Sequence, residues 1–273
     1  MKQSPVLSGE EALMTRTISE DRMPLTVQDL SRIDDTSTAQ AAPDRVYTEL
    51  RRRILNFDLP PGATLGRTEI AAHFSVSQTP VREALQRLEL DGLVLIYPQS
   101  KTLVSRIDVR QLSETQFLRV AVETEIVRRL AENPNPDALA RANALIQMQL
   151  ALVESTDQMA MFSDLDRRFH RTLFEAMGVG SLHSMVTRRL GHMYRAQRLE
   201  LPRKGKMQAI VDAHRAILDG IASGNAERAV ASMRSHLSGT ILRIASLRKE
   251  HPKFFTEDAF VLTGWSIGED GWE

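Results

Sequence analysis

Residues 69–85 read EIAAHFSVSQTPVREAL, and this stretch predicts how the first part of the chain folds. Ile70 and Phe74 lie on one face of a short helix, and Val81 and Leu85 supply the inner face of the helix that follows. A short first helix that holds a second helix, whose N-terminal residues meet base edges, is the helix-turn-helix of DNA-binding proteins. The alternative is a helical hairpin with solvated polar residues and no DNA partner.

The segments on either side extend this unit to a small domain over residues 44–108. A helix begins near Arg45 and ends before the helix-breaking residues Pro60-Pro61-Gly62. Two apolar runs after the second helix are typical of a hairpin, the wing of a winged helix-turn-helix. The other expected elements are helices over 68–74 and 79–90 and strands over 93–97 and 103–107.

Polar side chains at the start of the second helix are the candidates for DNA contact. Ser77 suits the N-cap position, and Pro80 suits the first turn, where its missing N–H costs nothing. Gln78, Thr79 and Arg82 are then left facing outward. We count Ser77, Gln78, Thr79 and Arg82 among the predicted DNA-binding residues.

The composition is that of an ordinary globular protein, and it excludes several kinds of site. The chain has 273 residues, enough for two domains, and its 35 basic and 35 acidic residues cancel. The winged-helix segment is nearly neutral as well, with nine Lys and Arg against eight Asp and Glu, so DNA binding requires basic residues gathered on one face. Cysteine is absent, which excludes disulfides, thiolate metal ligands and cysteine nucleophiles.

The sequence carries no apolar run near the roughly 18–20 residues that span a bilayer, so we expect a cytoplasmic protein with no membrane partner. Residues 1–43 are rich in polar side chains and are expected to form a flexible extension. Residues 251–273 hold both tryptophans amid glycine and acidic residues, and we interpret them as a C-terminal arm.

Residues 109–250 carry helical periodicity almost throughout and form the second expected domain. The expected fold class is therefore mainly α, an N-terminal winged helix-turn-helix followed by an all-helical antiparallel bundle. The six expected helices span about 109–131, 136–155, 157–176, 181–199, 206–222 and 226–248.

Four side chains in this bundle have the spacing of a metal site. Asp166 and His170 are four residues apart and stand on one face of a helix. His214 and His236 lie at similar distances on either side of the turn at residues 223–225, so in an antiparallel pair they reach a similar height. Three imidazoles and a carboxylate suit a divalent ion, zinc above all, with nickel, cobalt, manganese or iron as options. Buried histidines satisfied by hydrogen bonds are the alternative.

Residues 44–108 resemble the winged helix-turn-helix of the GntR family of bacterial transcription regulators. The matching segments are LPPG at 59–62, TEIA at 68–71, VSQTPVREAL at 76–85 and LELDGLV at 88–94. The resemblance implies a sequence-specific regulator whose partner is double-stranded operator DNA.

The family's DNA contacts carry over with several departures. Arg82 matches the recognition-helix arginine, which contacts guanine or phosphate. Gln78 stands where the family usually has arginine, and its carboxamide suits the adenine N6/N7 edge. Thr68, with Arg67 beside it, replaces an arginine common in the preceding helix. Lys101 replaces the glycine of the wing tip, where it adds charge for a phosphate or the minor groove but makes a positive φ less favourable.

Residues 109–250 are similar to the FCD effector domain of the FadR subfamily. The matching motifs are FLRVAVE at 117–123, LDRRFH at 165–170, AHRAIL at 213–218 and MRSHL at 233–237. In the metal-binding branch of this subfamily the ligands fall on Asp166, His170, His214 and His236. The other histidines, at 73, 183, 192 and 251, match no ligand position and are interpreted as ordinary polar residues.

The resemblance also implies an effector site and an assembly. Arg119 matches an arginine that faces the pocket and meets an effector carboxylate, although an ion pair with Glu123 one turn later is the alternative. Tyr194 and Arg195, on a helix expected to line the cavity, are further candidates, and Arg195 could equally be solvated. Members of this subfamily are generally homodimers.

These features predict a transcription regulator whose operator affinity is controlled by a small carboxylate bound at the metal site. One alternative is a metal-dependent hydrolase, because an ion with open positions can activate water. A hydrolase would not need the winged helix, and the sequence has no helical His-Glu-x-x-His motif to place an acid–base residue. Another alternative is a constitutive repressor in which the metal is purely structural.

Overall fold

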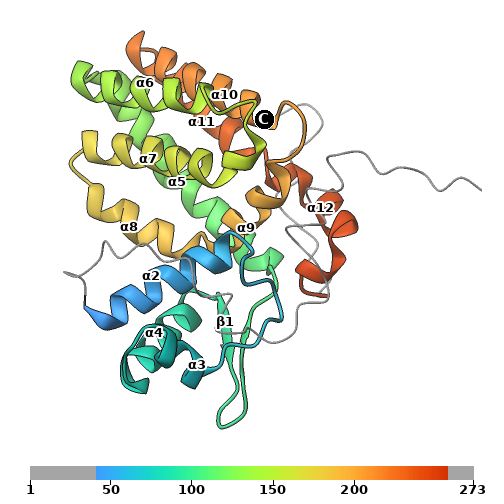
Figure 1. The fold of residues 1–273 in the computed structure, drawn as a ribbon. Helices are drawn as coiled ribbons and strands as arrows, with labels where there is room; N and C mark the ends of the chain where they lie inside the picture. The colour runs from blue at the N-terminus through green and yellow to red at the C-terminus, as the bar shows by residue number, and fades with distance from the viewer. Residues whose placement is uncertain (1–40, 258–273) are drawn as a thin grey trace, which may run out of the picture. The chain divides into compact units, whose positions relative to one another are not determined.

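The computed structural model describes residues 41–257 and divides the chain into two compact units (Figure 1). The first unit ends at Arg106 and the second begins at Ile107. Most of the expected N-terminal extension, and the C-terminal arm from residue 258 onward, lie outside the described residues. Of the extension, residues 42 and 43 already belong to the first helix, so that helix begins earlier than expected.

The first unit is a winged helix-turn-helix, as predicted. Its side chains with almost no exposed surface include Val46 and Ile54 on the first helix and Val81 and Leu88 on the third, which together form the core. The two strands pair antiparallel with Val94 opposite Val104, and both are shorter than expected. The elements are α2 (Ala42–Leu55), α3 (Arg67–His73), α4 (Gln78–Leu90), β1 (Val94–Ile96) and β2 (Thr102–Val104).

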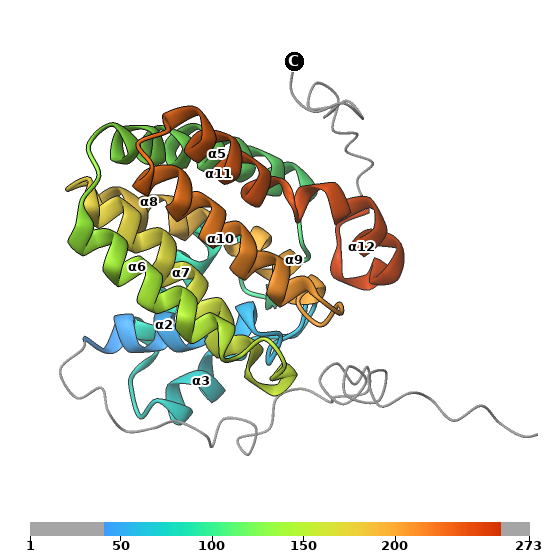
Figure 2. The ribbon, with the colours of Figure 1, turned by 90° about the horizontal axis from the view of Figure 1, so that it is seen from above.

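The second unit is a bundle of helices around an apolar core. Figure 2 shows α6, α7, α10 and α11 side by side, with α5 packed against α11. Phe162 and Phe169 on α7 and Met233 on α11 have no exposed surface. The helices are α5 (Val109–Glu132), α6 (Pro136–Leu150), α7 (Met159–Ala176), α8 (Gly180–Arg189), α9 (Gly191–Glu200), α10 (Lys206–Ala222), α11 (Ala226–Ser238) and α12 (Ile244–Glu250).

Two of the six predicted bundle helices are wrong as single helices, because the structure has two helices in each of these ranges. The helix expected over 181–199 breaks at Leu190, just before Gly191, and the helix expected over 226–248 is interrupted after Ser238, where Gly239 follows. Glycine has a low helix propensity, and a single glycine inside an apolar periodic pattern does not reveal whether tertiary packing will use it as a break. The helix expected over 136–155 ends early, at Leu150.

Within residues 41–257, no helix combines the length and the apolar character that a bilayer crossing requires.

Helices α10 and α11 approach each other closely at Gly220 of α10. A Cβ atom on this glycine would lie 2.7 Å from the backbone N and Cα of Ala229 on α11. Such distances are well inside van der Waals contact, so the two helices can pack this closely only because residue 220 has no side chain. This contact sets the spacing of the helices that carry His214 and His236.

We predict that Gly220→Ala lowers the unfolding free energy of the second unit by about 1–2 kcal/mol, because overpacking outweighs the gain in helix propensity. Chemical denaturation followed by circular dichroism measures this change. Gly239→Ala is the matched control, since its Cβ would meet no atom closer than the Lys206 Nζ at 3.5 Å. A Gly220→Ala protein at least as stable as the wild type would contradict the close-approach interpretation.

Candidate functional site

The predicted DNA-binding side chains all lie on the surface of the first unit. Gln78, at the start of α4, donates from Nε2 to the Thr68 hydroxyl of α3 at 3.5 Å, so these two predicted contacts are neighbours. In the wing the Lys101 ammonium lies 5.7 Å from the centre of the Tyr97 ring, and the positive φ falls on Gln99. The exposed residues are Arg67, Thr68, Ser77, Gln78, Thr79, Arg82 and Lys101.

The four predicted metal ligands come together in the second unit. Asp166 and His170 project from α7, His214 from α10 and His236 from α11. Each offers a ligand atom, and these atoms all lie within 4.8 Å of one another. His170 and His214 are buried, whereas Asp166 and His236 are partly buried. The spacing argument from the α10–α11 turn therefore agrees with the three-dimensional arrangement.

Polar side chains from two other helices contact the outer nitrogens of two of these rings. His170 Nδ1 lies 2.5 Å from the Glu123 carboxylate of α5, and the His214 Nδ1–H donates to Gln149 Oε1 of α6 at 2.8 Å. An Nδ1–H directed at an oxygen leaves the Nε2 lone pair free for a metal. His170 Nε2 lies 3.2 Å from His236 Nε2, which is a close approach between two inner nitrogens.

The inner nitrogen of His214, Nε2, is buried without a hydrogen-bond partner among residues 41–257. The Asp166 carboxylate lies 3.4 Å away from it. A buried nitrogen without a hydrogen bond is costly, and a bound cation would satisfy its lone pair. Three imidazoles and one carboxylate at this separation therefore fit a divalent ion such as zinc.

The protonation states of Asp166, His214 and His236 are those that metal ligands need. Burial alone would raise the pKa of Asp166, but the contact with His214 and the nearby His170 and His236 hold it well below its usual range. Burial lowers the pKa of His214 even though Asp166 opposes the shift, and burial together with His214 lowers the pKa of His236 much further. A charged Asp166 with neutral His214 and His236 can bind a metal without these three groups first losing protons.

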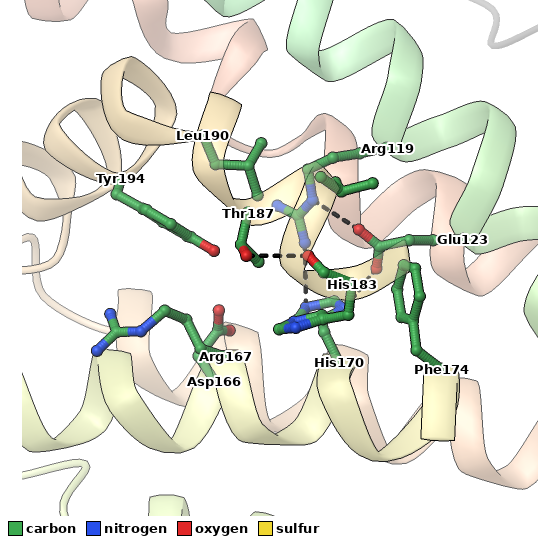
Figure 3. Close-up of a pocket in the computed structure, with 11 residues that line it drawn as sticks. Arg119, Glu123, Asp166, Arg167, His170, Phe174, His183, Thr187, Leu190 and Tyr194 are labelled. Carbon is green, nitrogen blue, oxygen red and sulfur yellow. Dashed lines mark hydrogen bonds and ion pairs between the residues drawn. The ribbon is translucent and has the colours of Figure 1, made fainter. Parts of the chain in front are cut away.

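A small cavity, partly open to solvent, borders this cluster (Figure 3). Asp166 and His170 form part of its wall, so a molecule in the cavity would reach the metal ligands. The other lining residues come from α5, α7, α8 and α9 and the α8–α9 junction, and they are Arg119, Glu123, Arg167, Phe174, His183, Val186, Thr187, Leu190 and Tyr194.

The structure places two of the three predicted effector residues at the cavity. Arg119 lines it and also forms the alternative ion pair, with Nε 2.7 Å from Glu123, and its Nη2 lies 3.3 Å from His170 Nε2. Tyr194 lines it from α9, and its ring stands 5.6 Å from the Arg167 guanidinium.

The third predicted effector residue, Arg195, is wrongly assigned. Its side chain is fully buried and is not part of the cavity wall, so the solvated alternative fails too. Its Nη2 donates to His192 Nδ1 at 3.0 Å, and burial lowers its pKa to about 9. Adjacent residues on a helix point about 100° apart, so when Tyr194 faces the cavity Arg195 faces elsewhere.

His183 and Thr187 of α8 and Arg167 of α7 belong to the cavity wall and were not predicted. His183 was interpreted as an ordinary polar residue, but burial and the nearby His170 lower its pKa to about 4, so it is neutral at pH 7. A signal was present, because His183, Thr187 and Leu190 follow helical spacing on one face. That face carried no motif, and nothing in the local pattern directed it toward a cavity.

Family comparisons match both units. Residues 43–104 match the family described as "Bacterial regulatory proteins, gntR family", and residues 114–239 match the FCD domain. A Streptomyces ambofaciens protein, "Uncharacterized HTH-type transcriptional regulator in unstable DNA locus", is 35% identical over 78% of this chain and 89% of its own length. The chain belongs to the GntR family of bacterial transcription regulators. The FCD match fits the predicted FadR subfamily.

More distant relatives of this GntR regulator agree. The HTH-type transcriptional repressor RspR of Escherichia coli is 24% identical over 80% of this chain and 96% of its own length. The solved structure of E. coli McbR/YncC has the same fold, with a TM-score of 0.62 and 21% identity over 77% of this chain and 99% of that one. The GntR family match and the 35% identical relative identify the chain as a transcription regulator and not as the metal-dependent hydrolase of the alternative.

We predict that the metal-free GntR regulator binds one zinc ion per chain at the four-ligand cluster. Zinc at a hundred times its Kd should raise the unfolding free energy by about 2.7 kcal/mol, because the ion binds the folded chain. His214→Ala should lose this stabilisation, since it removes the most buried ligand. Thermal unfolding with and without zinc, together with elemental analysis, measures both effects.

His251→Ala is the matched control, because His251 lies outside the cluster, and it should keep the full zinc response. Equal zinc responses in the wild type and His214→Ala would rule out this cluster as the metal site.

Proposed function

We infer that this GntR regulator is of the FadR type, binds operator DNA as a homodimer and responds to a small carboxylate at a metal-containing effector site. The observation that carries this proposal is the convergence of four metal-ligand side chains beside a cavity, two of which, Asp166 and His170, form part of its wall. The cavity wall also includes Arg119, His183 and Tyr194, which are groups that can bind oxygen atoms. A regulator whose partner is operator DNA would act in the cytoplasm.

Asp166, His170, His214 and His236 would hold the divalent ion, and zinc suits their borderline donor set best. The ion supplies positive charge that an effector carboxylate can bind. Arg119 adds cationic charge beside it, while Tyr194 can donate a hydrogen bond from the far side of the cavity. The cavity is small, which favours a small effector.

DNA recognition is assigned to the exposed start of α4 and to the wing. Arg82 would contact guanine or phosphate, and Gln78 would contact an adenine edge with Thr68 beside it. Thr79 and Ser77 sit at the same helix end, where backbone and hydroxyl groups can meet phosphate. Lys101 would neutralise a phosphate at the wing. A homodimer then implies a two-fold-symmetric operator.

Effector control follows from a population shift. A carboxylate that binds one arrangement of the paired DNA-binding units more tightly than another changes the fraction of molecules able to hold both half-sites. The effector needs no contact with DNA for this. A metal that only stabilises the bundle is the competing proposal, and chelation separates the two.

We predict that Arg82→Ala abolishes specific operator binding, because losing a bidentate guanine contact costs about 1–3 kcal/mol per half-site and a dimer pays it twice. Gln78→Arg should instead shift the preferred base from adenine toward guanine at one position. Selection from randomised half-sites followed by band-shift assays measures both. Arg110→Ala, an exposed arginine on α5 paired with Glu114, is the control. Unchanged sequence preference in both α4 variants would refute this assignment.

We predict that EDTA leaves the bundle folded at 25 °C and removes the response to carboxylates, because the apolar core around Phe162, Phe169 and Met233 holds the helices without an ion. Circular dichroism reports the helix content, and operator affinity with and without citrate, L-malate, D-gluconate or acetate reports the response. Cooperative loss of helix after EDTA would instead establish a structural metal.

A further inference from the structure

Gln149 is a fully buried amide on α6, a helix that packs against α7 and α10. Its Oε1 accepts the Nδ1–H of His214 at 2.8 Å. Its Nε2, however, has no hydrogen-bond partner among residues 41–257. An apolar side chain of the same size would avoid the cost of that unsatisfied amide, about 1–3 kcal/mol. Stability of the bundle alone therefore does not explain why a glutamine occupies this position.

The hydrogen bond from His214 decides which of its two nitrogens carries the proton. With the proton on Nδ1 and donated to Gln149, the Nε2 lone pair faces Asp166 and the inner rings. Without an acceptor at Nδ1, the proton would move to Nε2 and be donated to the Asp166 carboxylate 3.4 Å away. That arrangement would occupy two of the four metal ligands with each other.

One face of the His214 ring is also in contact with a neighbour. Phe169 stacks on it with ring centres 3.9 Å apart and an angle of 16° between the planes. Phe169 thus fixes the plane of the ring, while Gln149 fixes which edge points inward. His170 has a comparable arrangement, with Glu123 at its Nδ1, so two ligands on different helices are both oriented from behind.

We propose that Gln149 is a positioning residue of the metal centre, which holds His214 in the Nδ1–H form with Nε2 directed at the ion. This inference rests on the proposed metal site and adds a residue to it that does not touch the ion. Outer partners of ligating histidines typically change metal affinity by about 10–100-fold when removed.

The test uses the full chain and the variant Gln149→Met, which keeps the length and volume of the side chain but has no acceptor oxygen. We expect its zinc Kd, measured by competition with a chromophoric chelator, to rise about 10–100-fold. The visible spectrum of its cobalt-loaded form should also change, because a change in the ligand set alters the cobalt transitions. The melting temperature of the metal-free protein should stay close to that of the wild type.

Two further proteins make the result specific. Gln147→Leu is the matched control, an exposed glutamine on the same helix, and should leave both the zinc Kd and the cobalt spectrum unchanged. Gln149→Glu retains an acceptor oxygen and should restore tight zinc binding. Wild-type affinity and spectrum in Gln149→Met would overturn the proposal, as would equal losses in Gln149→Met and Gln147→Leu.

A direct measurement on the wild type covers the case in which Gln149→Met does not fold. Long-range ¹H–¹⁵N correlation spectra of the zinc-loaded protein should assign the proton of His214 to Nδ1. A His214 that binds through Nδ1 would overturn the positioning role even though zinc is bound. If the wild type binds no zinc, the proposed metal function fails and takes this inference with it, a result distinct from either of the others.

Discussion

The burial of four polar donors inside an apolar bundle is the constraint on which this site depends. Imidazole and carboxylate groups lose their water when α7, α10 and α11 pack together, and that loss is tolerable only where other groups replace it. Helices α5 and α6 supply part of the replacement through Glu123 and Gln149. The buried His214 Nε2, which has no hydrogen-bond partner among residues 41–257, lies 3.4 Å from the Asp166 carboxylate.

The same packing determines how the site is reached. Gly220 lets α10 approach α11 closely, and the ring centres of His214 and His236 lie 4.6 Å apart as a result of the helix pairing. On the other side, the break at Leu190 ends α8 and begins α9, and residues from both sides of the break line the cavity. Helix α9 also carries His192, which accepts the backbone N–H of Asp108 at 3.0 Å, directly before α5 begins. One short helix therefore contacts both the cavity and the start of the second unit.

Charge in the cavity is more balanced than a count of arginines implies. Arg119 faces the cavity, but Glu123 neutralises it from one turn away, and its Nη2 is directed at His170. Arg167 shares its charge with Asp164 at 3.1 Å. Carboxylates therefore already orient the two arginine side chains at the cavity. An anionic ligand would be recognised by the fixed positions of these guanidinium groups more than by a net positive charge.

Spacing along single helices was enough to predict the winged helix-turn-helix, the Asp166–His170 pair and the surface position of Gln78 and Arg82. Such patterns report which face of an element is apolar, because burial repeats with the period of the helix. Pairing across one short turn extended the prediction to His214 and His236. Arg195, one position past Tyr194, shows the limit, since its direction depended on where the helix broke.

By itself, the sequence determined the class of both units and the residue types available for a metal, because local periodicity and turns are set by neighbouring residues. Only the tertiary structure decided that Gln149 meets His214 across 65 positions, and that His183 belongs to the cavity. Contacts between distant segments depend on how whole helices pack around a shared core, and no local pattern contains that information.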